Sequence, residues 1–550
     1  MKHTTICNPI NIRYQYQHTY HSRESADPAV VLFKGEYFLF ASHGSGYWCS
    51  KDLAQWEYIP VDTELIPDFK KFAPGPCVIG DRIYITHSED GNVLYTDDPH
   101  DGNSWVNMGK PYGWWDPALF YEDGYLYVIE GLSDCKPIRI AKLDPQTLEV
   151  LEGPVDVCCS DKANRGFERS GDDHEDDVRR PFFEGGWLNK HNDKYYLTYA
   201  VPGTEFSVYA DGCFVADEIM GPYNYCENSP VVFKSTGFMR GCGHGCLFED
   251  AEGRWWKVDT TVISKNHLFE RRLAIFPAKF GKNGHLYTNT LRGDYPMPIP
   301  SHNPTPFDTP TKDWHLLSYG KDVTASSCLN DKHLPHLAAD ENSTTWWSAV
   351  TGDSGEWLLM DLGKEYDVCS IQLNFADQDA DDVWGRNNDF CYRYVLSASA
   401  DGESFFTVAD RVSLPNDLSH DYFELDDVTK IRYVKVTNMG PIPANGKFAV
   451  SGLRVFGYGG GSAPMPVSGI SATRWDDTRD MTVSWTGSDD AQGYFVRVGI
   501  DPDELYTHYQ VVGKCSVHVG CLNKGVRYYV AVDSYNESGI TVGTTTVVVE

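Results

Sequence analysis

Short apolar runs alternate with polar turns along the first 300 residues, and this pattern predicts β-strands almost throughout. Aromatic runs such as Lys194-Tyr195-Tyr196 follow Asp-Gly or Asn-Asp turns, which favour hairpins. No long stretch has the apolar period of an amphipathic helix. Quasi-repeats of about 60–80 residues predict a β-propeller of about five blades over residues 1–300, with a large β-sandwich as the competing architecture.

Three of the hairpin units begin with an acid. The acids stand in Ala26-Asp27-Pro28, Trp115-Asp116-Pro117 and Phe183-Glu184-Gly185, and a short apolar run, a turn and an aromatic strand follow each one. Asp before Pro is by itself a common turn, because the residue before Pro avoids the helical region. One unit used three times with a carboxylate at its start instead indicates that the blades bring three acids to the propeller axis.

Beyond the propeller the pattern predicts a connector and two smaller domains. A Pro-rich stretch over residues 301–316 is typical of a stiff connector, and the Gly-rich residues 458–464 are typical of a flexible linker. Residues 317–457 and 465–550 alternate apolar and polar positions, which favours antiparallel sandwiches. The fold class expected for the whole chain is therefore all-β: a propeller followed by two β-sandwiches.

Charge narrows the choice of partner. The 550 residues include 78 Asp and Glu against 47 Lys and Arg, a formal net charge of −31. A chain this acidic repels phosphate backbones and anionic membrane surfaces, so we expect neither a nucleic acid nor a membrane as its partner. A carbohydrate is compatible with this charge. Tyr and Trp are abundant and suit sugar rings, although β-proteins also use them as strand formers.

The cysteines and the N-terminus bear on the compartment. The 15 cysteines show neither a disulfide framework nor a CxxC pair, which favours free thiols in a reducing compartment over a structural zinc site. The first residues lack the apolar core of a signal peptide, and no apolar run could cross a bilayer. We expect a cytoplasmic protein; a secreted or periplasmic protein whose signal had been removed would look the same.

Convergent carboxylates suit the hydrolysis of a glycosidic bond. One carboxyl group donates a proton to the leaving oxygen, and a second activates water or attacks directly. The donor needs a raised pKa, which burial or a neighbouring negative charge supplies. The longer side chain of Glu184 suits the donor, a short Asp suits the water side, and a third carboxylate can hold and orient the donor.

These motifs resemble glycoside hydrolase family 43 over residues 1–300, and Gly243-His244-Gly245 supports the resemblance. It implies a five-bladed propeller and an inverting mechanism. It also implies that Asp27 is the general base, that Glu184 is the general acid, and that Asp116 tunes the pKa and orientation of the acid.

The resemblance associates His244 with a bound cation, held through waters, although a His in a Gly-rich turn is also commonly structural. Calcium would be the ion, in a structural role. No cofactor is required for the reaction itself, and the sequence contains no dedicated calcium loop.

Three tryptophans, Trp48, Trp115 and Trp187, are candidate walls of the sugar subsites, and Trp115 and Trp187 lie one and three residues from an acid. Arg272 is a candidate contact to substrate hydroxyls. Core packing is the alternative role of the tryptophans, and pairing with Glu270 that of Arg272. The acidic segment 164–180 is expected to form a loop that narrows the pocket, or else a solvated surface loop. Its Glu168 and Glu175 are rivals of Glu184 for the acid; we prefer Glu184 because a strand is a firmer platform.

The two smaller domains also resemble known families. Residues 317–457 are similar to a factor 5/8 type C, or discoidin, domain through Thr345-Trp346-Trp347-Ser348 and Gly355-Glu356-Trp357. In enzymes this fold often binds carbohydrate, sometimes with structural calcium, and it also serves as a packing spacer. Residues 465–550 resemble a fibronectin type III domain, which is usually a spacer.

Together these features predict an inverting, exo-acting glycoside hydrolase that releases a terminal pentose, α-L-arabinofuranose or β-D-xylose, from a plant polysaccharide such as xylan or from an oligosaccharide. The choice of a pentose rests on the resemblance. A galactan-active hydrolase of the same family is the second enzyme hypothesis. A non-catalytic carbohydrate-binding protein is the alternative from another class, but such a protein has no need of all three acids.

Overall fold

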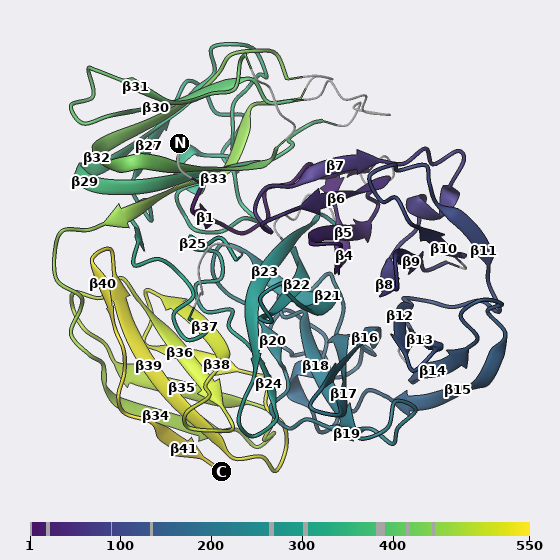
Figure 1. Ribbon diagram of the computed structural model, residues 1–550. Helices are drawn as coiled ribbons and strands as arrows, with labels where there is room; N and C mark the ends of the chain where they lie inside the picture. Colours follow the sequence, from purple (N-terminus) through teal and green to yellow (C-terminus); the bar gives the residue numbers. More distant parts are fainter. Residues whose placement is uncertain are drawn as a thin grey trace.

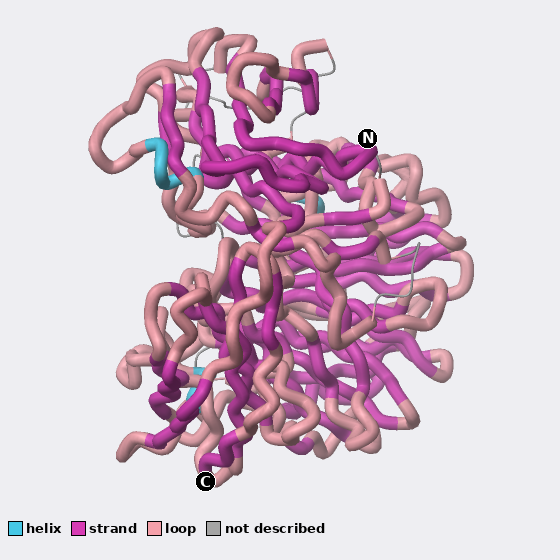
Figure 2. Tube along the Cα trace, turned by 90° about the vertical axis from the view of Figure 1, so that its left-hand side faces the viewer, coloured by secondary structure: helices cyan, strands magenta, loops and turns pink. Residues whose placement is uncertain are grey.

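The computed structural model describes residues 3–17, 22–89, 91–132, 136–262, 269–300, 306–380, 391–413, 418–442 and 446–550. Within these ranges the chain is all-β, as predicted, and only the 3-10 turns η1 (Pro67–Lys70), η2 (Gly166–Glu168) and η3 (Pro335–Ala338) interrupt strands and loops (Figure 2). No described helix is long and apolar enough to span a membrane. Residues 301–305 of the predicted connector lie outside the described residues.

Five antiparallel meander sheets make up most of the first 290 residues. The first contains β4 (Ala26–Phe33), β5 (Glu36–Ser42), β6 (Gly46–Ser50) and β7 (Glu57–Pro60). The second contains β8 (Gly75–Ile79), β9 (Arg82–Thr86), β10 (Val93–Thr96) and β11 (Val106–Gly109). The third contains β12 (Ala118–Glu122), β13 (Tyr125–Glu130), β14 (Ile138–Leu143) and β15 (Val150–Cys158).

The fourth sheet contains β16 (Glu184–His191), β17 (Lys194–Val201), β18 (Ala210–Ala216), β19 (Asn224–Tyr225) and β20 (Val232–Phe233), and the fifth contains β21 (Arg240–Glu249), β22 (Trp255–Val262), β23 (Arg271–Phe280) and β24 (Leu286–Thr288). The first strands of the sheets, β4, β8, β12, β16 and β21, contact one another in a closed cycle. Figure 1 shows the sheets arranged around a common centre. The chain therefore forms the predicted propeller, and the first strand of every blade lies nearest the axis.

The N-terminal segment closes against the last blade. Strand β1 (Thr5–Ile6) pairs with β25 (Met297–Pro298), and β2 (Gln15–Gln17) pairs with β3 (Ser22–Glu24). The buried Asn8 amide donates to the carbonyls of Ile275 and Gly293 at 2.8 and 2.7 Å. These bonds join the start of the chain to its fifth blade.

The second unit, drawn in green in Figure 1, is built from one eight-stranded sheet that encloses a core around Trp347 and Phe375. Its strands are β26 (His315–Leu316), β27 (Asp322–Ala325), β28 (Trp347–Ser348), β29 (Trp357–Phe375), β30 (Tyr394–Ser399), β31 (Phe406–Asp410), β32 (His420–Asn438) and β33 (Ala449–Tyr458). Strand β26 lies within the predicted connector. It pairs with β33 because burial of Leu316 and Leu317 draws this segment into the sheet.

The third unit, in yellow, is a sandwich of two antiparallel sheets. One contains β34 (Ser468–Arg474), β35 (Met481–Thr486) and β38 (Ser516–Val519); the other contains β36 (Gly493–Gly499), β37 (Thr507–Val512), β39 (Tyr528–Asn536), β40 (Gly539–Thr541) and β41 (Val547–Val549). Its apolar side chains, Trp485 and Val530 among them, belong to the same core cluster as Phe183 and Phe233 of the propeller. The third unit and the propeller are therefore packed through a shared core.

Candidate active site

Residues from all five blades line a cavity of about 330 Å³ at one end of the propeller axis. The lining residues are Asp27, Phe72, Ser88, Glu89, Trp115, Asp116, Leu132, Arg179, Phe182, Glu184, Thr204, Glu205, His244, Phe269 and Arg271. The three acids predicted from the sequence motif thus lie in one cavity together with His244. Because each acid stands at or just before the first strand of its blade, the repeated motif and the ring of blades together account for their convergence.

Local backbone distortions aim these side chains into the cavity. Asp27, Asp116 and His244 have φ angles of 52°, 44° and 50°, in the left-handed region that Asp and His tolerate better than most residues. Register shifts interrupt the pairing of β4 after Ala26, of β16 after Glu184 and of β21 around His244. Such bulges turn a side chain away from the regular alternation of a strand, and they recur beside active sites.

Asp27 is a buried carboxylate surrounded by donors and cations. The Ser42 hydroxyl donates to its Oδ2 at 2.5 Å, while His244 Nδ1 and Arg271 Nη1 lie 3.4 and 3.5 Å from its Oδ1. Burial acts to raise the pKa of Asp27, but the charges of His244 and Arg271 and the bond from Ser42 outweigh burial and hold the pKa below its usual range. Asp27 is therefore ionised at neutral pH.

Glu184 is in the opposite state. Burial first, and then the negative charge of Asp116, raise its pKa to about 8. The Tyr209 hydroxyl donates to Glu184 Oε1 at 2.5 Å, which leaves Oε2 to carry the proton. Glu184 is therefore a neutral acid at pH 7, the state in which a carboxyl group can donate a proton.

Asp116 is electrostatically linked to both of the other acids. Burial raises its pKa to about 6; the charge of Asp27 also raises it, whereas His244 lowers it. Its backbone N–H donates to the Ser88 hydroxyl at 2.9 Å, which fixes the start of the strand. At neutral pH its charge faces Glu184 and helps to hold the proton there.

His244 is the basic side chain that faces the three acids. Burial acts to lower its pKa, but the negative charges around it, that of Asp27 first, outweigh burial and raise the pKa above its usual range. A Cβ atom at Gly185 would lie 2.6 Å from the ring, so only glycine leaves room for His244 there. The closely approaching ring and the φ of +62° at Gly185 together explain why glycine follows the acid.

Behind His244 lies a second cluster of charges, which is buried and separate from the cavity. The backbone N–H of His244 donates to Asp211 Oδ1 at 2.9 Å. The Lys257 ammonium lies 2.6 Å from Asp211 Oδ2 and 2.8 Å from Asp259 Oδ1, and all three side chains are at most 1% exposed. This cluster, the rear triad, fixes the backbone position from which His244 reaches the acids.

The residues around His244 do not fit a directly ligated metal ion. Among the described residues no group of three or more His, Cys, Asp or Glu side chains could hold one. A calcium ion held near His244 through waters stays a prediction.

Of the predicted substrate contacts, Trp115 lies in the cavity wall and is 49% exposed. Trp48 does not reach the cavity: it lies on the third strand of its blade, is 0% exposed and packs in the core beside Tyr58. Trp187 is half-buried between the fourth and fifth blades, where its indole N–H donates to the Leu247 carbonyl at 3.1 Å. Both residues therefore pack in the core. Trp48 lies on a strand away from the axis, and Trp187 lies beyond the bulge of β16, so both side chains point between blades.

The prediction for Arg272 is wrong by one residue. Its guanidinium turns away from the cavity, donates to His420 Nε2 at 2.9 Å and lies over the Tyr14 ring. Its neighbour Arg271 lines the cavity and forms an ion pair with Glu24. Successive side chains on a strand point to opposite faces. The Arg-Arg pair therefore predicts that one arginine faces the site, but it does not show which one.

The segment upstream of Glu184 reaches the cavity through Arg179 and Phe182. Its rival acids do not: Glu168 is fully buried against Tyr199, Arg165 and Ser160, and Glu175 bonds back to the Asp173 N–H. The sequence leads us to expect that the segment 164–180 narrows the pocket, but no pattern in it singles out Arg179, because the place of this residue depends on contacts with residues far along the chain.

Comparison with known proteins shows two families. The family model described as "Glycosyl hydrolases family 43" matches residues 19–286, and the model described as "F5/8 type C domain" matches residues 322–451. A β-xylosidase of Xylanibacter ruminicola is 28% identical over 216 residues, which are 38% of this chain and 60% of the relative. A xylosidase/arabinosidase of Bacteroides ovatus is 27% identical over 162 residues, 29% of this chain and 44% of the relative.

The matched segments therefore span less than two thirds of these relatives. Among solved structures, a glycoside hydrolase is 18% identical with a TM-score of 0.47, covering 78% of this chain and 97% of the other. A thermostable family-43 glycoside hydrolase is 20% identical with a TM-score of 0.44, covering 54% of this chain and all of the other. The chain thus contains a family 43 glycosyl hydrolase domain over residues 19–286 and an F5/8 type C domain over residues 322–451.

Proposed function

We propose that this family 43 glycosidase removes terminal α-L-arabinofuranose or β-D-xylose from plant polysaccharide or oligosaccharide, with inversion at the anomeric carbon. The observation that carries the proposal is that three carboxyl groups in one cavity have different pKa values, which increase from Asp27 to Asp116 to Glu184. Asp27 has a lowered pKa, Asp116 a pKa of about 6 and Glu184 a pKa of about 8. A charged base and a protonated acid therefore coexist at neutral pH, as two-carboxylate hydrolysis requires.

In the proposed reaction, Glu184 donates its proton to the glycosidic oxygen as the bond from the anomeric carbon to that oxygen breaks. Asp27 accepts a proton from a water molecule whose oxygen attacks the anomeric carbon from the opposite face. The products are the free alcohol and a sugar of inverted configuration. Exchange with solvent returns the proton from Asp27 to Glu184. This mechanism requires about 6.5–9.5 Å between the two carboxyl groups, which leaves room for the water.

Two observations support a short, terminal sugar as the substrate. The cavity of about 330 Å³ is near the lower end of the roughly 300–1,000 Å³ range of ligand pockets. The half-exposed Trp115 offers an apolar face beside Asp116 on which a sugar ring can stack. The names of the curated relatives, β-xylosidase and xylosidase/arabinosidase, favour pentoses.

For the other units we propose supporting roles. The F5/8 type C domain is proposed to bind carbohydrate near the substrate polymer. The two-sheet arrangement of residues 465–550 supports a fibronectin type III fold for the third unit. The described cysteines are all free thiols, which supports the proposal of a cytoplasmic location.

A panel of nitrophenyl glycosides tests the activity. We expect the arabinofuranoside or the xyloside to be cleaved, and Asp27→Asn to abolish cleavage in a matched preparation. Cleavage of galactosides alone would overturn the pentose assignment, and binding of oligosaccharides without any cleavage would point to the non-catalytic alternative. Proton NMR of the first-formed sugar then checks the stereochemistry: the anomer should be opposite to that of the substrate, and retention would contradict the role of Asp27.

A further inference from the structure

The segment between β15 and β16 forms one wall of the catalytic cavity, yet much of its support comes from the third unit. Arg179 and Phe182 of this segment line the cavity. Its backbone pairs with the third unit: the Gly166 N–H donates to the Leu522 carbonyl, and the Lys524 N–H donates to the Asn164 carbonyl, both at 2.8 Å. The segment 159–183 is called the wall loop below.

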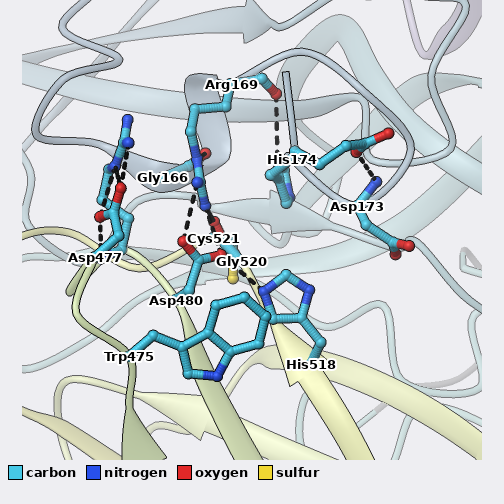
Figure 3. Close-up of polar contacts among 12 residues, drawn as sticks. Gly166, Arg169, Asp173, His174, Trp475, Asp477, Asp480, His518, Gly520 and Cys521 are labelled. Atoms are coloured by element: carbon cyan, nitrogen blue, oxygen red, sulfur yellow. Dashed lines mark hydrogen bonds and ion pairs between the residues drawn. The ribbon is translucent and has the colours of Figure 1, made fainter. Parts of the chain in front are cut away.

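A buried ion pair anchors the first half of the wall loop, as Figure 3 shows. Arg169 Nη1 and Nη2 donate to the two oxygens of Asp480 at 2.9 and 2.8 Å, and Nη2 also donates to the Gly520 carbonyl. His518 Nε2 lies 2.7 Å from Asp480 on the other side. Arg169 and Asp480 form two parallel bonds and are almost fully buried, so this pair holds the wall loop in a fixed position on the third unit.

A second anchor of the wall loop comes from Arg479. Its Nη1 donates to the Lys162 carbonyl at 2.6 Å and lies 2.9 Å from Asp177 Oδ1. The Arg479 side chain is 7% exposed, and Asp477 holds it from its own unit. Asp477 thus fixes Arg479 within the third unit, while Nη1 of Arg479 reaches the wall loop.

From this anchor a short chain of contacts leads to the cavity. The Lys162 ammonium donates to the carbonyls of both Asp177 and Arg179 at 2.6 Å. Asp176 accepts the N–H groups of Val178 and Arg179, each at 2.9 Å. The Arg179 guanidinium then forms an ion pair with Glu205, which also lines the cavity, and lies over the Phe206 ring.

We propose that the third unit, through Arg479, positions Arg179 as a substrate-binding residue at the rim of the catalytic cavity. Arg179 is 48% exposed, so its donors face both Glu205 and the solvent that a sugar would displace. A long side chain on a surface loop loses considerable rotamer entropy when it is ordered. Arg479 lowers that cost before substrate arrives, because it holds the Asp177 carboxylate and the Lys162 carbonyl, and Lys162 in turn bonds the backbone carbonyls of Asp177 and Arg179. Arg479 is a positioning residue, and it touches no reacting atom.

The test compares Arg479→Met with Glu504→Gln in the full-length chain. Glu504 forms a 2.8 Å ion pair with Lys279 that also joins the third unit to the propeller, but away from the wall loop. For aryl pentoside cleavage we expect Arg479→Met to raise KM about fivefold to tenfold, a loss of about 1 to 1.4 kcal/mol, with kcat within twofold. Glu504→Gln should leave KM unchanged.

A double-mutant cycle separates positioning from general loosening. If Arg479 acts through Arg179, then Arg479→Met adds less than a twofold rise in KM when Arg179 is already Met. Asp177→Asn cuts the same link from the loop side, and because its side chain is 53% exposed this change should not disturb folding. An unchanged KM in Arg479→Met and Asp177→Asn, or effects that add in full to Arg179→Met, would overturn the proposal.

Because the kinetic readout rests on the proposed function, hydrogen exchange supplies a second one. Peptides over residues 172–182 should exchange faster in Arg479→Met and Asp177→Asn than in the wild type or Glu504→Gln. If the wild type cleaves no pentoside, the proposed function fails while this comparison still tests the link. Equal exchange in all four proteins would contradict the anchoring itself.

Discussion

Two acidic clusters meet at His244-Gly245 and differ in how their charges are balanced. In the rear triad, one ammonium lies 2.6 and 2.8 Å from two carboxylates, and all three groups are shut off from solvent. In the cavity, three carboxylates face a sugar-sized space, and the cations His244 and Arg271 both lie beside Asp27, at 3.4 and 3.5 Å. The uneven placement of cations leaves Glu184 to take up a proton, whereas in the rear triad Lys257 lies directly between the two carboxylates, although burial still raises the pKa of Asp259 to about 7.

The number of acids alone therefore does not create an acid and a base; the placement of cations around them does. Similar carboxylates serve as framework where a cation lies between them, and as an acid and a base where the cations favour one of them. Each of the following changes either breaks this difference or measures it.

The largest effect is expected from Glu184→Gln, which keeps the shape and the bond from Tyr209 but removes the transferable proton. Cleavage of pentosides with poor leaving groups should fall by about 10²–10⁴-fold. A dinitrophenyl leaving group needs little protonation and should restore much of the rate. Steady-state kinetics with both substrates checks this, with circular dichroism to confirm folding; an equal loss for both leaving groups would contradict the role of general acid.

Lys257→Met should destabilise the protein without directly touching the cavity. It leaves Asp211 and Asp259 buried without their shared cation, which typically costs about 3–5 kcal/mol. Lys194→Met is the matched control, because its ion pair with Asp217 is exposed and worth about 0–1 kcal/mol. Denaturant unfolding followed by fluorescence measures both; a loss below 1 kcal/mol for Lys257→Met would show that the rear triad is not a framework element.

The smallest effect is a displacement along the pH axis. In the wild type, kcat/KM should fall as the pH rises through about 8, because Glu184 then loses the proton it must donate. Asp116→Asn removes a negative charge that raises the pKa of Glu184, so the falling limb should move to lower pH, by about one unit. A pH profile of kcat/KM for both proteins measures the shift; a limb that stays in place would separate Asp116 from Glu184.

The sequence carried enough information for the acids but not for the walls of the cavity. Asp27, Asp116 and Glu184 could be predicted because each stands at the start of a repeated hairpin, so local pattern and blade geometry suffice. Arg271 and Arg272 are consecutive on one strand, so their side chains point to opposite faces. The sequence does not show which of the two faces points into the cavity. Trp48 illustrates a related limit, since membership of the same hairpin repeat as Asp27 does not show that its strand, β6, lies away from the axis.

Other parts of the site depend on contacts between distant segments. Arg179 reaches the cavity with support from Arg479, 300 positions further along the chain, and no periodicity records such a contact. The chain beyond residue 464 resembles a self-contained module, yet its apolar side chains complete a core that begins in the propeller.

Because of this shared core, the parts of the molecule that unfold together do not coincide with the modules recognised from the sequence. Phe183, the neighbour of Glu184, is packed in the same cluster as Val530 near the C-terminus. Heat or denaturant that loosens the C-terminal sandwich must also loosen the backbone beneath Glu184. Loss of the last module is thus expected to disorder the strand that carries Glu184, even though no described residue of that module lines the cavity.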